Sequence, residues 1–368
     1  MNNKKLIWGV VGVVVILVIV ILSSRLGNNE TGALRIGAII PLSGTTAFFG
    51  TEFKNGFDLA NKIYKLDISI EDSKSTPADG VSALQKLIVT NNPDIVIPIL
   101  SSISAAVTPV ALEKKIVVFQ SLTSANDIAA QSPYVFRYFT SGAQEAPIMS
   151  ELASEKLGAK TAYVIYQNDE YGLAYANAFK KDFESRGGSL LSMDGFVRTE
   201  SDFRGTLTKV KAAKPDFLYV IALDQSLATI LKQAKESGVK SKIATNWVLA
   251  APAVIALAGS ASEGVYLTSP SYYTAPTPEV ERFASDYKAA YGKDPSAYSA
   301  IGYDLVDILS RVKKTDGDAD HQKLIADITA IGGIKGIMGD LKIDAVGEIT
   351  FALYPAVVEG GKLKLINN

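Results

Sequence analysis

The sequence contains no cysteine and only one histidine in 368 residues. A chain without cysteine has no disulfide, no thiol nucleophile and no cysteine-ligated zinc site. His321 lies in the charged stretch KKTDGDADHQK, which is typical of an exposed turn and lacks the spacing of a calcium-binding loop. We therefore expect neither a Ser-His-Asp triad nor a metal site.

The glycine-rich motifs that bind phosphates are also missing. No G-x-G-x-x-G follows a strand pattern, and GGIKGIMG from Gly332 does not have the G-x-x-x-x-G-K-[ST] spacing. The net charge is −1, without the clustered basic residues that nucleic-acid binding requires. Asp169, Glu170 and Asp224 could supply a carboxylate pair for acid–base chemistry, although surface charge or helix capping explains them equally well. We expect no catalytic residues, no cofactor and no nucleic-acid partner.

One long hydrophobic run lies near the N-terminus. LIWGVVGVVVILVIVIL covers 6–22, and with two serines the uncharged stretch reaches 24. That length is just enough to cross the ~30 Å hydrocarbon layer of a membrane. A cleaved secretory signal has a shorter apolar region and a small-residue cleavage site, which ILSSRLG matches poorly.

We therefore predict an uncleaved transmembrane anchor over 6–24. Lys4 and Lys5 precede it, and the positive-inside rule places the tail, 1–5, in the cytoplasm. The polar stretch 25–33 would be a tether, and the rest of the chain would be extracytoplasmic at the cell membrane.

From Ala33 onward, short apolar runs alternate with amphipathic helical patterns, which indicates an α/β fold with parallel strands. The expected strands are LRIGAII, LDISIED, DIVIPIL, IVVFQ, TAYVIYQ, SLLSMDGF, DFLYVIAL, KIATNW and GVYLTSP. The pattern helix, Pro-Asp, strand, polar cluster, helix and strand occurs twice, around Pro93 and Pro215. This approximate duplication predicts two similar α/β lobes.

Polar clusters follow the predicted strands in both halves. They are Ser43–Thr46, Ser101–Ser102, Ser121–Ser124, Asn168–Asp169, Asp224–Ser226 and Thr245–Asn246. Such residues cap helices, and a helix N-terminus also binds small anions. In open parallel sheets the carboxyl ends of the strands border the ligand crevice. Two lobes that face each other would enclose a cleft lined by these clusters, which capping alone does not predict.

Several segments match a known family in order along the chain. LRIGAIIPLSGTTAFFGTEFKNGFDLAN, NDEYGLAYANAFKKDFESRGG, DFRGTLTKVKAAKPDFLYV and PSAYSAIGYDLVDIL are similar to segments of type I periplasmic solute-binding proteins. The chain from Leu34 onward resembles their leucine/isoleucine/valine-binding group.

The resemblance implies two Rossmann-like lobes joined by three crossovers. By that likeness, 34–141 with 271–341 would form the first lobe, and 142–270 with 342–368 the second. Proteins of this kind trap a small solute between the lobes and present the closed form to an ABC permease, so permease subunits are the implied partners. Closure would be a hinge motion driven by contacts that the ligand makes with both lobes.

The resemblance also implies ligand contacts. Ser102 and Ser124 match hydroxyls that hold the ligand carboxylate, and Leu100 and Leu122 are their backbone neighbours. The remaining contacts implied in the two lobes are Phe49 as an aromatic wall, Ser101 beside the first hydroxyl, and Tyr171 as a cover from the second lobe.

The side of the site that would hold an ammonium group departs from the pattern. Amino-acid binders of this group place a Glu where this chain has Asn246-Trp247, and an acid near the first crossover is replaced by Ser141-Gly142. A buried ammonium without a carboxylate partner is costly. Asp224 either supplies this charge or caps the next helix. If it only caps the helix, the ligand is an apolar or aromatic carboxylate without an amine, and Trp247 stacks on it.

The leading hypothesis is a membrane-tethered extracytoplasmic receptor of an ABC importer, with an aliphatic amino acid as its ligand. One alternative is the sensory ectodomain of a signalling complex, which would need a separate membrane partner because only five residues precede the anchor. The other is an enzyme on the same scaffold, which would turn over its bound compound.

Overall fold

The structure, a computed structural model, describes residues 34–125, 129–312 and 321–366. The predicted tail, anchor and tether at 1–33 lie outside the described residues. Within the described part of the chain, no helix combines the length and apolar character needed to span a membrane.

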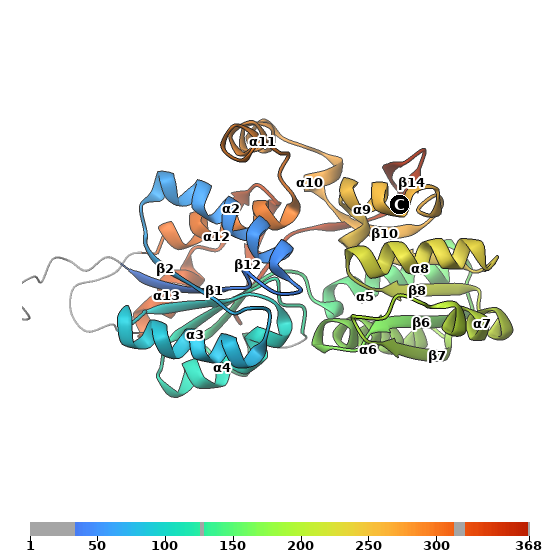
Figure 1. Cartoon of the computed structure of the whole chain (residues 1–368), viewed down its shortest axis with the longest axis horizontal. Helices are drawn as coiled ribbons and strands as arrows, with labels where there is room; N and C mark the ends of the chain where they lie inside the picture. Colours follow the sequence, from blue (N-terminus) through green and yellow to red (C-terminus); the bar gives the residue numbers. More distant parts are fainter. Residues whose placement is uncertain (1–33, 126–128, 313–320, 367–368) are drawn as a thin grey trace, which may run out of the picture.

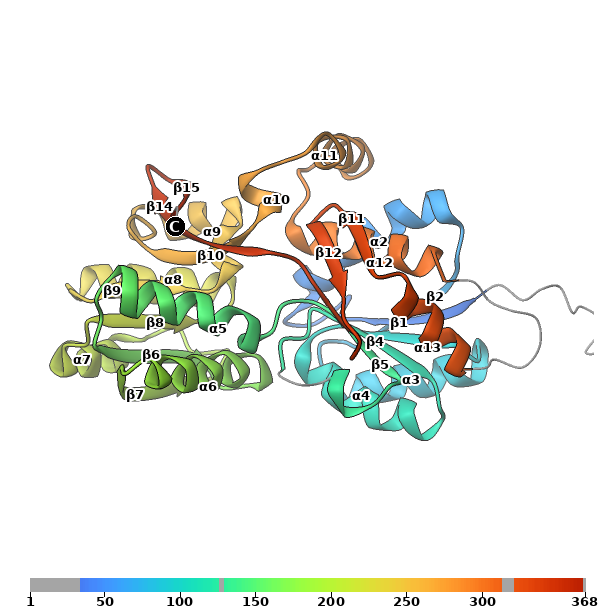
Figure 2. The same cartoon turned by 180° about the vertical axis from the view of Figure 1, so that it is seen from behind.

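Two lobes lie side by side, each built on one sheet with helices on both faces (Figures 1 and 2). The first lobe begins with β1 (Arg35–Ile40), α2 (Ala47–Tyr64), β2 (Asp67–Asp72), α3 (Pro77–Thr90), β3 (Ile95–Pro98), α4 (Ser101–Glu113), β4 (Val117–Ser121), a 3-10 turn (Ala129–Gln131) and β5 (Val135–Tyr138).

The chain then crosses to the second lobe. Its elements are α5 (Gly142–Glu151), a π-helical turn (Leu152–Lys156), β6 (Thr161–Gln167), α6 (Glu170–Ser185), β7 (Ser189–Phe196), α7 (Arg204–Ala213), β8 (Phe217–Ile221), α8 (Asp224–Glu236), β9 (Lys242–Thr245), two 3-10 turns (Trp247–Ala250 and Gly259–Ala261) around α9 (Pro252–Ala258), and β10 (Tyr266–Pro270).

The last part of the chain completes both lobes. It contributes α10 (Ser271–Thr274), α11 (Pro278–Tyr291), α12 (Ala297–Ser310), α13 (His321–Ala330), β11 (Gly333–Gly336), β12 (Gly339–Ile343), β13 (Glu348–Thr350), β14 (Leu353–Glu359) and β15 (Lys362–Leu365). The first sheet has the order β11-β12-β13-β5-β4-β3-β1-β2, and the second has β15-β14-β10-β9-β8-β6-β7.

All nine strands expected from the sequence are present, and they pair in parallel within the two sheets. Strands β5 and β11 to β15 were not expected. β11, β12, β14 and β15 form antiparallel pairs at the sheet edges, where half-exposed strands carry a weaker apolar signal.

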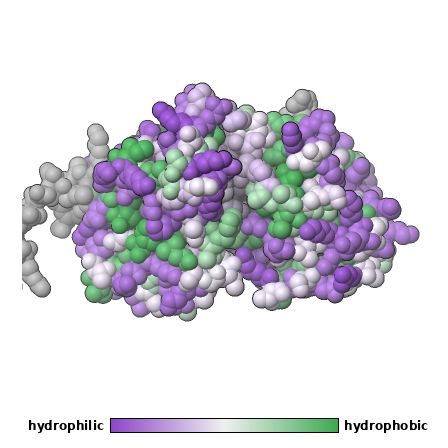
Figure 3. Space-filling model, turned by 45° about the horizontal axis from the view of Figure 1, so that its top comes forward, coloured by the Kyte–Doolittle hydropathy of each residue, from purple (hydrophilic) through white to green (hydrophobic). Residues whose placement is uncertain are grey.

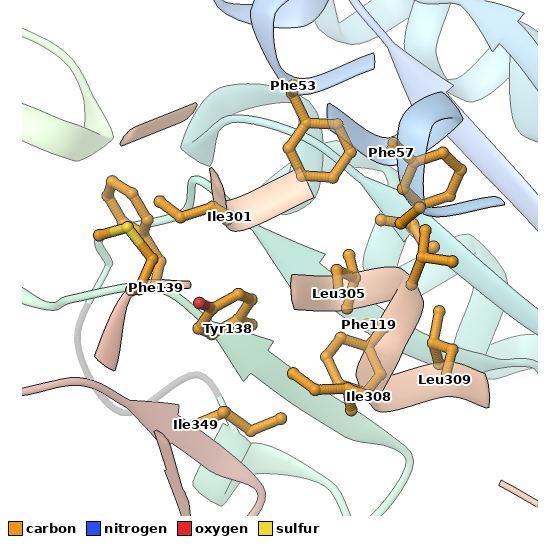
Figure 4. Close-up of a cluster of buried hydrophobic side chains, with 14 of the residues drawn as sticks. Phe53, Phe57, Phe119, Tyr138, Phe139, Ile301, Leu305, Ile308, Leu309 and Ile349 are labelled. Carbon is orange, nitrogen blue, oxygen red and sulfur yellow. The ribbon is translucent and has the colours of Figure 1, made fainter. Parts of the chain in front are cut away.

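The third crossover lies further along the chain than the sequence analysis placed it. β12 pairs with β13, and β13 pairs with β5 of the first sheet, with Ile349 opposite Tyr138. Ile349 is fully buried in the core of the first lobe (Figure 4). The chain therefore stays in the first lobe through Thr350 and crosses at 351–352, whereas we expected the second lobe to resume at 342.

Helices α2 and α12 pack closely over the first sheet because glycines face the partner backbone. A Cβ at Gly302 would lie 2.2 Å from the Phe53 carbonyl oxygen, and one at Gly56 would lie 1.8 Å from the Ser299 carbonyl oxygen. Phe53 and Phe57 of α2 meet Ile301, Leu305 and Ile308 of α12 in the same buried cluster (Figure 4). This contact holds the C-terminal half of the first lobe to its N-terminal half.

We expect Gly302→Ala to lower the free energy of unfolding by about 1–3 kcal/mol, because the added methyl group pushes the two helices apart. Urea unfolding followed by circular dichroism measures the change. Gly205→Ala on the exposed face of α7, where a Cβ meets nothing within 4 Å, is the control and should be neutral or slightly stabilising. Equal stability of the two variants would contradict the close-packing argument.

Candidate functional site

A cavity lies between the lobes, at the carboxyl ends of the parallel strands, and its empty space is about 620 Å³ when the open solvent at its mouth is included. Eight of the nine residues that we assigned to the ligand site line it: Phe49, Leu100, Ser101, Ser102, Leu122, Ser124, Tyr171 and Trp247. Asp224 is not among the lining residues.

The space-filling view shows hydrophilic side chains spread over both lobes with hydrophobic ones among them, so the surface shown does not itself mark the site (Figure 3).

The serines after β3 do not cap α4. The N-cap residue is Leu100, and its side chain makes no capping bond. Instead, the Ser101 hydroxyl accepts a hydrogen bond of 3.1 Å from the Ser124 backbone N–H, which links the segments after β3 and β4. The Ser102 hydroxyl lines the cavity without a hydrogen-bond partner among the described residues. Capping is therefore the wrong explanation for these two serines.

Leu100 and Leu122 turn the backbone at the ends of β3 and β4 through positive φ angles of 77° and 49°. A non-glycine residue in this region costs about 1–3 kcal/mol, and such strain clusters at ligand sites. The first N–H groups of α4 have no acceptor within the helix. The two turns therefore present backbone N–H groups and serine hydroxyls together at the cavity.

Aromatic rings form much of the remaining wall. The Phe49 and Tyr298 rings meet edge to face at 5.1 Å, and the Trp247 ring lies 5.8 Å from Tyr298 and 5.5 Å from Phe139. Trp247 is only 2% exposed, and its indole N–H donates to the Thr140 hydroxyl at 3.0 Å. Tyr298 was not predicted as a site residue, although it lies in the segment PSAYSAIGYDLVDIL. The indole is thus held by the protein and offers the cavity only part of its surface.

Asn246 stands where the resemblance predicts a Glu. Its side-chain N–H donates to the Tyr171 hydroxyl at 2.6 Å, while its carbonyl oxygen is buried with no hydrogen-bond partner among the described residues. An unpartnered buried acceptor is costly, so this oxygen is available to a ligand donor. Asn246 and Tyr171 both line the cavity.

Asp224 is the first residue of α8, and Leu223 is the N-cap residue. One of its carboxylate oxygens is buried without a hydrogen bond in the described part of the structure. Burial raises the pKa of Asp224 to about 6, although the nearby Arg198 charge opposes this shift. The carboxylate lies close to the cleft but not in its wall, and whether it holds an ammonium stays a prediction.

Glu145 is an acid that the sequence analysis missed. At the place of the acid expected near the first crossover, Ser141 forms a capping box with Gln144 at the start of α5. One helical turn further on, Glu145 is completely buried, and one of its oxygens accepts hydrogen bonds from the Trp247 backbone N–H at 3.1 Å and from the Thr268 hydroxyl. Its other oxygen has no partner among the described residues, and burial raises its pKa to about 7. The sequence signal was a charged residue on the apolar face of GAQEAPIMSE.

Arg198 is the third site residue that was not predicted from the sequence. It lies in a turn after β7 and is the only lysine or arginine among the described residues that line the cavity. Its guanidinium carbon lies 5.8 Å from the centre of the Phe49 ring, across the cleft. An arginine after an exposed edge strand gave no sequence signal.

A protein-family model described as periplasmic binding protein matches residues 33–362. The chain belongs to the periplasmic binding protein family. Its two lobes have the type I fold of that family, as the resemblance predicted.

Individual relatives of this periplasmic binding protein point to the same group. The leucine-, isoleucine-, valine-, threonine- and alanine-binding protein of Pseudomonas aeruginosa is 23% identical over 327 residues, covering 86% of this chain and 87% of its own. The Streptococcus pneumoniae branched-chain amino acid transporter substrate-binding protein, solved with isoleucine, has a TM-score of 0.78 and 22% identity over 90% of this chain and 98% of its own.

A third similar protein was solved with a different ligand. The ABC transporter solute-binding protein of R. palustris in complex with benzoate has a TM-score of 0.80 and 24% identity over 91% of this chain and 96% of its own. The resemblance to the leucine/isoleucine/valine-binding group is confirmed, and it is a group of transporter binding proteins rather than enzymes. Because the same fold accommodates both ligands, the fold does not select between them.

The buried Glu145 predicts a pH dependence of stability. The pKa of Glu145 is about 7 in the folded protein, against the ordinary glutamate value of 4.5 in the unfolded chain. The stability that the protonated side chain contributes to the fold is therefore fully present below about pH 4.5 and is lost as the pH rises through 7. Glu145→Gln cannot ionise and so does not suffer this loss. We expect the free energy of unfolding of the variant, minus that of the native chain, to increase by up to ~3 kcal/mol between pH 5 and pH 8. Urea midpoints at both pH values measure the difference.

The matched control is Glu236→Gln on the exposed side of α8, which should keep the native pH dependence. Asp304 and Asp224 also have raised pKa values, so the slope in Glu145→Gln should be reduced rather than abolished. An unchanged slope would show that Glu145 is ionised in the folded protein throughout this range.

Proposed function

We propose that this chain is the extracytoplasmic solute-binding component of an ABC importer and that it traps a small carboxylate-bearing solute between its lobes. A branched-chain or other aliphatic amino acid is the first candidate. The observation that carries the proposal is the group of donors at the ends of β3 and β4, where Leu100 and Leu122 bring serine hydroxyls and helix N–H groups to one wall. The names of the relatives support the same ligand class.

The donor group matches a carboxylate in charge and in number of hydrogen bonds. A hydrogen bond to a charged group contributes ~1.5–3 kcal/mol, and a helix N-terminus adds a favourable dipole. Three or four such bonds, less the ordering costs, could supply much of the ~8 kcal/mol that corresponds to micromolar affinity. No lysine or arginine of the described first lobe lines the cavity, so the carboxylate would rely on these neutral donors.

Closure of the cleft follows from the division of the site between lobes. The serines and Phe49 belong to the first lobe, whereas Tyr171 and Asn246 belong to the second. A ligand that contacts both walls binds the closed form more tightly than the open form, and this difference in affinity shifts the equilibrium towards the closed form. The closed pair of lobes would be the form that the permease recognises.

An amine-free apolar or aromatic carboxylate is the second candidate. Asn246 replaces the expected acid, and Asp224 lies outside the cavity wall. The acids that do line the wall are Glu170 and Asp169, and Asp169 is engaged as the N-cap of α6. Six aromatic side chains line the cavity: Phe49, Phe139, Tyr171, Tyr175, Trp247 and Tyr298. Flat ligands pack well against such rings. The benzoate-bound neighbour supports this candidate.

The anchor completes the proposal. We propose that 6–24 hold the protein in the cell membrane as a single-pass helix, with the binding lobes outside and permease subunits as partners. A sensory role with a separate membrane signalling partner is the alternative, and co-purification from membranes would distinguish the two.

The ligand class can be tested with the full-length chain in detergent carrying Trp8→Phe, which leaves Trp247 as its only tryptophan. We expect leucine, isoleucine or valine to change Trp247 emission and to release heat on titration. If 4-methylpentanoate or benzoate binds while the amino acids do not, the second candidate replaces the first. Absence of binding in both series would overturn the proposed ligand class.

Ser102→Ala tests the carboxylate receptor. The Ser102 hydroxyl makes no hydrogen bond with the described protein residues, so its removal should leave thermal stability unchanged. We expect the variant to weaken binding of the ligand found above by about 10–100-fold, the loss of one hydrogen bond to a charged group. Ser82→Ala on α3, outside the cleft, is the control. Native affinity in Ser102→Ala would contradict the receptor assignment.

A further inference from the structure

Arg198 reaches the cleft from the outer edge of the second sheet. It follows β7, the edge strand, and the hydrogen bond of 2.8 Å from the Glu200 N–H to the Val197 carbonyl closes the turn that carries it. The turn directs the side chain across the cleft to the face of Phe49, on the first turn of α2. A long cation therefore spans from the second lobe to the first beside the ligand cavity.

The guanidinium is only partly solvated and lacks a protein partner. No hydrogen bond or ion pair joins it to any residue that the structure describes, and burial lowers the pKa of Arg198. A guanidinium has five N–H donors, and burying a charge without hydrogen bonds is costly. The face of the guanidinium lies over the Phe49 ring, at 5.8 Å from its centre, which leaves the N–H groups at its edge available to a ligand.

Two carboxylates near Arg198 offset its charge without binding it. The Asp169 carboxylate accepts hydrogen bonds from the Gly172 N–H at 3.0 Å and from the Gln167 side chain, as the N-cap of α6. Asp224 acts on Arg198 only through its charge. With two acids already nearby, a second full negative charge on the ligand would be repelled, whereas a neutral oxygen would accept from the guanidinium without that cost.

The position of Arg198 relative to the serines sets which part of the ligand it meets. Ser101, Ser102 and Ser124 line the cavity from the first lobe, and Ser124 lies beside Tyr175. Arg198 lines it from the second lobe, where it lies over the Phe49 ring and its charge acts on Tyr171 and Tyr298. The Tyr171 ring lies 5.3 Å from the Tyr175 ring. The two donor groups are therefore separated by the aromatic part of the cavity.

We infer that Arg198 is a specificity-determining residue that donates hydrogen bonds to a neutral oxygen, a hydroxyl or carbonyl, at the end of the ligand remote from its carboxylate. This inference rests on the proposed function, because the serine group must hold the carboxylate for Arg198 to meet the other end. Within the proposed class of carboxylate-bearing solutes, the site would then bind a solute with a polar far end more tightly than its purely apolar counterpart, so an aliphatic amino acid would bind without being the preferred ligand.

Two near-isosteric pairs test this selectivity in the full-length chain by calorimetry: leucine with asparagine, and 4-methylbenzoate with 4-hydroxybenzoate. In whichever pair binds, we expect the oxygen-bearing member to bind about 10–100-fold more tightly, as one hydrogen bond to a charged donor predicts. Arg198→Met should abolish this preference, and Arg198→Lys should retain part of it. Arg204→Met, at an exposed arginine of the same lobe, is the control and should keep the full preference.

The outcomes separate the two proposals. Binding of one pair without a preference for the oxygen-bearing member, or with a preference that survives in Arg198→Met, overturns the role of Arg198 and leaves the proposed function intact. Failure of both pairs to bind overturns the proposed ligand class and this inference with it. Thermal unfolding of each variant shows that a lost preference is measured on folded protein.

Discussion

Trp247 follows β9 of the second lobe, yet its indole ring packs in the main hydrophobic cluster of the first. The ring contacts Phe139 on the first crossover, Phe351 on the third and Tyr298 on α12. The indole N–H of Trp247 donates to the Thr140 hydroxyl, and its backbone N–H donates to the Glu145 carboxylate. Both acceptors lie close to the first crossover. Because Trp247 lies where the crossovers meet and also lines the cavity, the geometry of the hinge and the shape of the site are coupled through one side chain.

Two features near the cavity destabilise the folded chain: backbone angles in an unfavourable region, and buried polar atoms without hydrogen bonds. Leu100 and Leu122 are held at positive φ although neither residue is glycine, and the surrounding sheet and helix over-determine them. Buried oxygens of Asn246, Asp224 and Glu145 have no hydrogen-bond partner among the described residues. Similar features occur elsewhere in the described chain, but Leu100, Leu122 and Asn246 line the cavity itself, where a ligand could use the exposed N–H groups and satisfy the Asn246 oxygen.

Much of the fold could be predicted because buried parallel strands have a strong apolar pattern. The nine expected strands all pair in parallel, and they include the edge strands β2 and β7. The third crossover could not be placed, because the assignment of β13 depends on Ile349 packing in the first lobe, a contact distant in sequence. The serine group was predicted from its place after strands, whereas Arg198 lies in a turn after an edge strand and gave no signal. The one signal for Glu145 was an acid on the apolar face of its helix.

The charges around the cavity bear on which ligand the protein prefers. An ammonium group beside Asn246 would find an unpartnered carbonyl oxygen, and it would feel Asp224 and Asp169 through space. The same ammonium would feel the opposing charge of Arg198, on which Asp169 and Asp224 also act. Protonation of Asp224, whose pKa is about 6, would shift that balance against a cationic group. The affinity for an amino acid should therefore depend on pH near 6, whereas an amine-free carboxylate held by neutral donors and rings has no such requirement.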